Sequence, residues 1–245
     1  MRRRLISVIH PDVLKESPAY AAQARYLPFA VFMAFIGIEE SVRFAASKDL
    51  LTNSQNMLYL LYPIKTVVVA TVLFHYRQSY TELSLKDLAH LPTTATVGLM
   101  GILVFFLWIN MDWAPLVSGR LQGFNPAQLS ATGVKFATIA FRIAGAVLVV
   151  PLMEELFWRS FLIRYIVDQN FAKVPIGSFT WPSFLLTVVL FGLEHHFVLA
   201  GMVAGILYSI VLYRTRSLVQ CVLAHAVTNL ALAIYVISTG KWYFW

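Results

Sequence analysis

Long apolar stretches alternate with short polar segments along most of the chain. Windows of about 20 mostly apolar residues, the length that a helix needs to cross a bilayer core, recur between residues 27 and 238. They predict seven membrane spans, at approximately 27–46, 57–75, 92–110, 134–157, 183–197, 199–213 and 218–238. The stretches are continuous rather than alternating, which favours helices over a β-barrel. An eighth short helix within 112–131 is compatible with the pattern.

The composition agrees with an all-α, polytopic transmembrane bundle. Of the 245 residues, 59% are hydrophobic and 13% are charged, whereas soluble domains average about 45–50% and 25%. A soluble globular protein is therefore excluded. No linker is long enough to separate domains, so we predict a single integral membrane domain over residues 1–245.

Positive charge gives the expected orientation. Twelve of the 19 Lys and Arg residues fall in segments on the N-terminal side of the membrane, four fall on the other side and three fall within spans. The positive-inside rule then places the N-terminus in the cytoplasm, with residues 1–26 as a basic cytoplasmic arm. Orientation in a bilayer accounts for the net charge of +7, so we expect a lipid bilayer and no nucleic acid as a partner.

Ionisable side chains inside spans require a reason, because each costs about 2.5–3.5 kcal/mol at the bilayer centre. The fourth predicted span ends with Glu154, Glu155 and Arg159. Glu155 and Arg159 are four residues apart on one helix face, so they can form an ion pair. Glu154 is rotated by about 100° and has no local basic partner, which leaves it able to face a cavity.

The fifth and seventh spans carry further polar groups. The fifth ends with Glu194, His195 and His196, and in the seventh His225 and Asn229 point the same way because they are four residues apart. Helix rise places these groups and Glu154 at similar depths in the cytoplasmic half of the membrane. We therefore predict that three helices of the C-terminal half bring one carboxylate, two imidazoles and an amide together.

Such a set suits hydrolysis at a carbonyl. A carboxylate and a histidine can hold and deprotonate a water molecule, while His and Asn donors stabilise the oxyanion that forms. The alternative interpretation is that these groups only hydrogen-bond one another between helices.

Three segments resemble the motifs of the CPBP intramembrane proteases, the CAAX-protease and bacteriocin-processing family also called Abi. They are EExxxR at Glu154, Glu155 and Arg159, FxxxH at Phe191 and His195, and HxxxN at His225 and Asn229. The resemblance covers about residues 134–235, which we define as the motif-bearing core. The first half of the chain, with its 58–65 and 80–83 segments, is similar to the bacterial branch called CAAX prenyl protease-related proteins.

The resemblance implies an intramembrane endopeptidase in a bacterial inner membrane, without a cofactor, acting on a membrane-associated polypeptide that in some members is prenylated. Carried over by motif position, Glu154 and His195 would activate water and His225 and Asn229 would form an oxyanion hole. Glu155 and Arg159 would be the supporting pair. Glu194 and His196 depart from the apolar residues that the family commonly has beside the motif histidine.

Three spans carry charges that the motifs do not explain. In the first span, Glu39 and Arg43 have i, i+4 spacing and are predicted to pair, while Glu40 is left over for a structural or substrate-groove role. Lys65 in the second span is expected to counter Glu40 or to snorkel. Arg142 in the fourth span needs a partner that the sequence does not identify.

Other chemistries stay open at this point. A zinc site from Glu154, His195, His196 and His225 would also activate water, although HExxH is absent. Glu154, His195 and Glu194 would serve a proton-coupled transporter, although no inverted repeat is present. A non-catalytic scaffold or immunity protein is a third class. Cys221 lies four residues before His225, but a lone cysteine among apolar residues is typical of a core.

Overall fold

The computed structural model describes residues 17–51, 54–112, 123, 125–126, 129 and 132–245, and these include no β-strand. Six helices are long and apolar enough to cross a membrane, and one more is apolar but shorter. This confirms the predicted polytopic helical bundle of about seven spans. Apart from the fourth span, the helices are α2 (Pro18–Ser47), α3 (Ser54–His75), α4 (Leu91–Ile109), α8 (Trp181–Glu194), α9 (Val198–Thr215) and α10 (Leu218–Thr239).

The fourth span is one continuous helix of 34 residues, but it is not uniformly α-helical. It consists of α5 (Thr132–Ala144), the π-helical turn η4 (Gly145–Val149), α6 (Val150–Glu155), the π-helical turn η5 (Leu156–Leu162) and α7 (Ile163–Tyr165). Pro151 in α6 has no N–H for the helix ladder, and a wider turn beside it accommodates that loss. Glu154 thus lies on one short α-helical turn between two π-helical ones.

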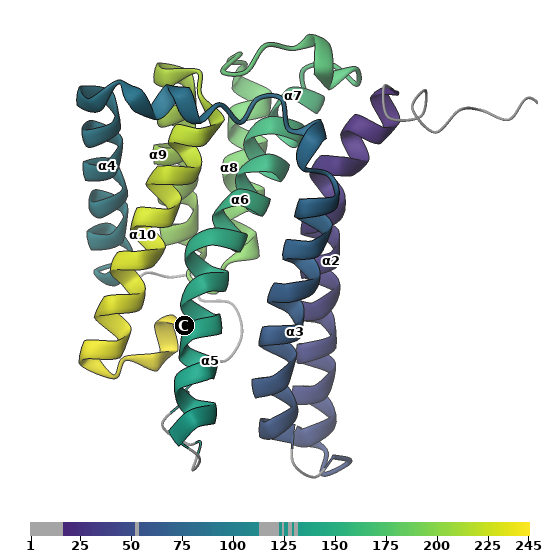
Figure 1. Ribbon diagram of the computed structural model, residues 1–245, viewed down its shortest axis with the longest axis vertical. Helices are drawn as coiled ribbons and strands as arrows, with labels where there is room; N and C mark the ends of the chain where they lie inside the picture. The colour runs from purple at the N-terminus through teal and green to yellow at the C-terminus, as the bar shows by residue number, and fades with distance from the viewer. Residues whose placement is uncertain (1–16, 52–53, 113–122, 124, 127–128, 130–131) are drawn as a thin grey trace, which may run out of the picture.

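This fourth helix runs through the middle of the bundle (Figure 1). On one flank α2 and α3 pack side by side, and on the other flank α10 packs against α4 and α9. The α4–α10 contact is close because Gly101 faces α10: a Cβ at that position would lie 2.4 Å from the Ala224 carbonyl oxygen. Small residues at helix interfaces allow such an approach in membranes.

Helix α8 is shorter than the predicted span 183–197. It ends at Glu194, and the backbone of His195 is extended (φ −97°, ψ 148°). Because only residues 195–197 join α8 to α9, the two helices form a tight hairpin whose tip lies partway along the bundle (Figure 1). His195 therefore occupies a helix end inside the protein.

Two predicted boundaries also differ. Helix α2 begins at Pro18, where the Ser17 hydroxyl accepts a hydrogen bond from the Tyr20 backbone N–H at 3.1 Å. Residues 18–26, predicted as part of the arm, are thus helical, and residues 1–16 lie outside the described residues. Most of 112–131, where an eighth helix was compatible with the sequence, lies outside them as well.

Large apolar side chains cover the outer faces of the bundle. Examples from four spans are Leu60, Phe74, Leu99, Phe136 and Ile234, each of which is at least 61% exposed. A soluble monomer rarely exposes apolar surface on this scale, whereas lipid would cover it. The exposed faces therefore identify an integral membrane protein.

A buried ionic network closes one end of the bundle. Arg25 of α2 donates two hydrogen bonds to Glu82, at 2.7 and 2.6 Å, and the Ser160 hydroxyl donates a third. Arg164 also donates to Ser160 Oγ, at 2.9 Å. The network joins α2 and the fourth helix to the segment that links α3 with α4.

Replacing Glu82 by Gln is expected to destabilise the protein most at neutral pH. Burial alone would raise the pKa of the Glu82 carboxyl, but hydrogen bonds and charge from Arg25, with the Ser160 hydroxyl, outweigh burial and lower the pKa. A lowered pKa contributes stability above the unfolded-state value of about 4.3 and loses it as the pH falls. We expect a loss of about 2 kcal/mol at pH 7 that shrinks toward pH 3. Thermal unfolding in detergent across this pH range measures it, and a loss that does not depend on pH would contradict the ionic explanation.

Candidate active site

A cavity of about 430 Å³ lies between the fourth helix and its neighbours. It is lined by side chains that the sequence motifs contain, by charged residues of α2 and α3, and by aromatic residues. The polar lining residues are Glu39, Glu40, Arg43, Lys65, Arg142, Glu154, Glu194, His195, His196, His225, Thr228 and Asn229. The four predicted catalytic side chains thus share one cavity, while their chemical roles stay predictions.

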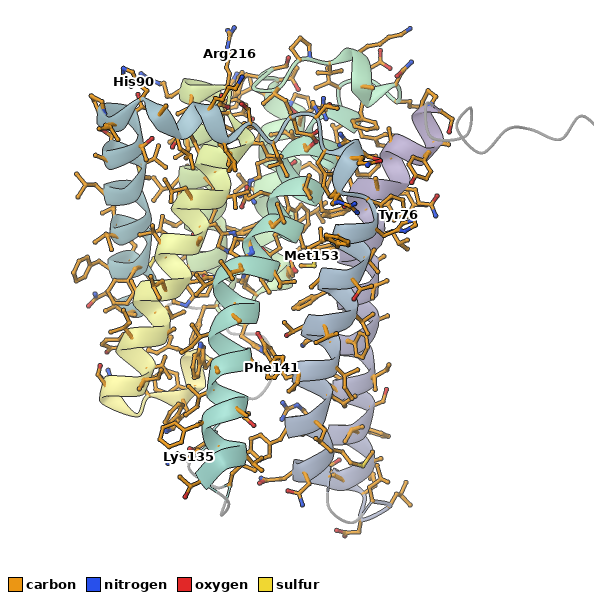
Figure 2. The ribbon with its side chains drawn as sticks, in the orientation of Figure 1. Tyr76, His90, Lys135, Phe141, Met153 and Arg216 are labelled. Carbon is orange, nitrogen blue, oxygen red and sulfur yellow. The ribbon has the colours of Figure 1, made fainter. Side chains whose placement is uncertain are left out.

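The cavity extends toward one end of the bundle. Figure 2 shows His90 and Arg216 at one end, Lys135 at the other, and Met153, the neighbour of Glu154, between them. From the level of Glu154 the lining continues to Arg142 and to Arg43 near the end of α2, which is the Lys135 end. The sequence places the catalytic groups themselves in the cytoplasmic half of the membrane. The lining instead extends toward the end that the charge count places outside, because α8 and α9 stop partway and leave space below their hairpin.

Glu154 is enclosed in the cavity wall. The residue is only 4% exposed and lines the cavity. Its Oε2 has no hydrogen-bond partner among the described residues. The neighbouring Glu155 points into the protein instead and is fully buried. This is the separation of the two carboxylates that the rotation of about 100° per residue predicts. Glu154 is therefore placed to meet a water molecule or a substrate.

His195 has a defined tautomer. Its Nδ1 lies 2.7 Å from the backbone carbonyl oxygen of Phe191, which can only accept a hydrogen bond. Nδ1 must therefore carry the proton, and in the neutral ring the lone pair is on Nε2. The Trp108 ring packs nearly perpendicular to the imidazole, with centroids 5.3 Å apart and planes at 78°. A neutral histidine held in this way can act as a base through Nε2.

His225 belongs to a buried triad with the supporting pair. Glu155 Oε1 lies 3.3 Å from Arg159 Nη1 and 3.0 Å from His225 Nδ1. The Tyr208 ring stacks on the imidazole, with centroids 4.9 Å apart and planes at 22°. The predicted Glu155–Arg159 pair is present, and it also positions His225. Glu155 accepts the hydrogen bond from Nδ1. The opposite nitrogen, Nε2, can therefore interact with a molecule in the cavity that His225 lines.

Asn229 is fixed by the π-helical turn. Its side-chain Nδ2 donates a hydrogen bond of 2.7 Å to the carbonyl oxygen of Ala146, in η4. A π-helical turn changes which backbone groups pair with one another, and this local change is one that the motif spacing does not reveal. The bond orients the amide, and the second hydrogen on Nδ2 can be offered to a substrate oxygen.

The charges of the first two helices pair differently from the prediction. Glu39 Oε1 contacts Lys65 Nζ at 2.8 Å, and Arg43 lies 3.5 Å from Glu40. The predicted Glu39–Arg43 pair and the predicted Lys65–Glu40 contact are therefore wrong. Lys65 is buried in the α2–α3 contact and requires a carboxylate that faces α3, and Glu39 is that residue. Arg142 lies over the Tyr62 ring, 4.3 Å from its centroid.

Several residues of the site were missed from the sequence. Trp158 donates a hydrogen bond of 3.1 Å from its indole N–H to Glu194 Oε2. Trp108 and Tyr208 hold the two histidines, as described above. An amphipathic aromatic residue inside a span is a weak signal by itself, because such residues are also common in apolar cores.

The described part of the chain forms neither a zinc site nor a cysteine nucleophile in the cavity. Among the described residues, no three His, Cys, Asp or Glu side chains are grouped so that they could hold a metal ion. Cys221 is fully buried, and its Sγ lies 3.5 Å from the Ser217 carbonyl oxygen rather than in the cavity lining. It packs as a small apolar residue.

Replacing Gly192 by Val is expected to displace His195 and to lower activity at least tenfold. A Cβ at Gly192 would lie 2.4 Å from Met202 Cγ and 2.8 Å from the Val198 carbonyl oxygen, so α8 and α9 would have to separate. Gly98→Val is the matched control, because a Cβ there meets nothing within 4 Å. Hydrolysis rates and melting temperatures of the two variants measure the effect. Equal rates for both would show that the hairpin does not set the position of His195.

Residues 136–231 match a family model described as "Type II CAAX prenyl endopeptidase Rce1-like". The matched segment begins in α5 and ends in α10, so it contains every predicted catalytic side chain. This part of the chain is similar to the CAAX endopeptidase family. No curated protein and no solved structure gives a significant match.

The Rce1-like domain confirms the family that the three motifs indicate. The protein is accordingly a peptide-bond hydrolase of an intramembrane family. Its first three described helices, α2 to α4, precede the matched segment but contribute Glu39, Lys65 and Trp108 to the same cavity. The cavity is thus built from both halves of the chain.

Proposed function

We propose that the cavity hydrolyses a peptide bond of a membrane-associated polypeptide by direct attack of water, without a metal or another cofactor. One observation carries the proposal: Glu154, His195, His225 and Asn229, from three separate spans, line the same cavity. A carboxylate, two imidazoles and an amide supply a base and oxyanion donors, which are the groups that hydrolysis of an amide requires.

In this mechanism Glu154 and His195 activate the water. The lone pair on His195 Nε2 and the Glu154 carboxylate both accept hydrogen bonds, so together they can orient one water molecule. Glu154 takes the proton as the oxygen attacks the carbonyl carbon. The enclosed position of Glu154 suits this role, because few waters compete for its carboxylate.

His225 and Asn229 stabilise the resulting oxyanion. Since His225 Nδ1 donates to Glu155, a second N–H bond from Nε2 requires the imidazolium form. Asn229 adds its second Nδ2 hydrogen. Arg159 balances Glu155, so the developing negative charge meets a donor set whose charge is positive overall.

The substrate is proposed to be a polypeptide held at the membrane, by a lipid group or by an apolar segment. Apolar and aromatic side chains line the cavity beside the polar ones, among them Phe32, Met33 and Phe197. The family's name specifies a prenyl substrate, and a prenylated CAAX-like peptide is one form of this class.

Cleavage of reporter peptides by the purified protein in liposomes tests the proposal. One reporter carries an apolar transmembrane anchor and the other carries a prenylated cysteine near its C-terminus. We expect the product masses to show hydrolysis of a peptide bond in the reporter. We also expect a metal chelator to leave the cleavage rate unchanged. Loss of cleavage on chelation would replace this mechanism by a zinc-dependent one, and no cleavage of either reporter would contradict hydrolysis of this substrate class.

Replacing Asn229 by Ala is expected to lower the rate by about 10²–10³ while the protein stays folded, as loss of one oxyanion donor does. The effect should fall on kcat more than on KM, because the donor acts when the oxyanion forms. Steady-state kinetics with the cleaved reporter measure it. An unchanged kcat would remove Asn229 from the mechanism.

A further inference from the structure

The catalytic cavity contains a carboxylate next to the motif histidine that the mechanism above does not use. Glu194, the last residue of α8, lines the cavity together with Glu154. Its Oε2 accepts the hydrogen bond from Trp158 Nε1. Trp158 is buried and belongs to the π-helical turn that directly follows Glu154 and Glu155. The carboxylate is thus held by the same helix that carries the proposed base.

Glu154 and Glu194 belong to the same part of the cavity lining. Trp158 follows Glu154 by four residues on the fourth helix, and its indole N–H reaches Glu194 Oε2 at 3.1 Å. Two carboxylates close together in a cavity of low dielectric cannot both stay ionised, so they hold one proton between them. The pair can therefore supply an ionised base and a protonated acid at the same time.

The position of Glu194 at a helix end favours the proton on this carboxyl. Glu194 is at the C-terminal end of α8, where the helix dipole disfavours a negative charge, whereas Glu154 lies within a helix that continues past it. The Trp158 N–H occupies Oε2 of Glu194, which leaves Oε1 for the proton. After that proton is given away, the same N–H stabilises the carboxylate that remains.

We propose that Glu194 is the general acid that protonates the nitrogen of the leaving amine. This inference rests on the proposed hydrolytic function of the cavity. The inference also gives a role to Glu194, which stands beside the motif histidine where an apolar residue is expected.

The protons balance over one cycle. Glu154 removes a proton from water as the water oxygen bonds to the carbonyl carbon. The Glu194 carboxyl then gives its proton to the amide nitrogen, the C–N bond breaks, and the carbonyl reforms as a carboxylic acid beside a neutral amine. The proton on Glu154 passes to the Glu194 carboxylate, directly or through one water, and restores the starting state.

The test compares two reporters that differ only at the scissile bond, one with the amide and one with a thioester. An amine nitrogen must be protonated to leave, whereas a thiol with a pKa of about 8.5 leaves as the thiolate without an acid. In Glu194→Gln we expect amide hydrolysis to fall about 10²–10⁴-fold and thioester hydrolysis to stay within a few-fold of the wild type. Glu154→Gln, which removes the base, is expected to lose both reactions.

A second variant keeps the test valid if Glu194→Gln does not fold. Trp158→Phe leaves the carboxyl in place but removes the N–H that stabilises its ionised form, so amide hydrolysis alone should fall about tenfold. Equal losses on the two reporters, or no loss on either, would overturn the assignment of Glu194 as the acid. If the wild type hydrolyses neither reporter, the proposed function itself fails. This outcome is distinct from a failure of the Glu194 assignment, which is judged only from variants of an active wild type.

Discussion

Replacing Glu154 by Gln is expected to lower peptide hydrolysis at least about 10³-fold while the protein keeps its fold. The side chain faces the cavity, and its Oε2 makes no hydrogen bond among the described residues, so the substitution breaks no ion pair that holds the bundle together. Gln has nearly the same shape but cannot accept a proton at neutral pH. General-base catalysis contributes about 10²–10⁴-fold, and here the same group also orients the water.

The control for this prediction is Glu40→Gln. Glu40 lines the part of the same cavity that is far from Glu154. Like Glu155, it pairs with an Arg on its own helix, but its pair with Arg43 is exposed. An exposed ion pair contributes at most about 1 kcal/mol, so we expect the rate to change less than about fivefold. Initial rates with the same reporter compare the two variants at equal melting temperature. A Glu154→Gln protein that retains a tenth of the wild-type rate would require another base.

The sequence predicts best where a rule acts within one helix. The spacing of Glu155 and Arg159 predicts their ion pair because residues four apart lie on one helix face. The same rule fails for Glu39 and Arg43, since it carries no information about Lys65 on the neighbouring helix. A buried lysine gains more from a counter-ion than a half-buried arginine does, and the tertiary contact therefore prevails.

The parts of the site that could not be predicted depend on backbone geometry and on distant contacts. Apolar periodicity does not reveal that the fourth helix contains two π-helical turns, although one of them supplies the carbonyl that orients Asn229. Nor does it show that α8 stops at Glu194, which places His195 at a helix end. The pairing of Arg25 with Glu82 joins residues 57 positions apart, and only the folded chain brings them together.

The buried triad gives the second large effect, which is on stability. Arg159 is completely buried, pairs with Glu155, and lies 4.3 Å from the centroid of the Phe191 ring. Replacing Arg159 by Met leaves a buried carboxylate whose remaining partner is His225. Breaking a buried pair in this way costs about 3–5 kcal/mol. We expect a large drop in melting temperature in detergent, whereas Arg43→Met, in the exposed pair, should change stability by less than about 1 kcal/mol.

The double variant Glu155→Leu with Arg159→Met separates stability from catalysis. Removing both charges leaves no unpaired ion, and apolar residues of similar size often replace a buried pair at little cost, so most of the lost stability should return. Activity should not return, because His225 Nδ1 loses the carboxylate that orients the ring. A stable and inactive double variant would show that the pair serves His225. A stable variant with wild-type activity would show instead that Glu155 and Arg159 only hold the helices together, and His225 would then have to act without a charged partner.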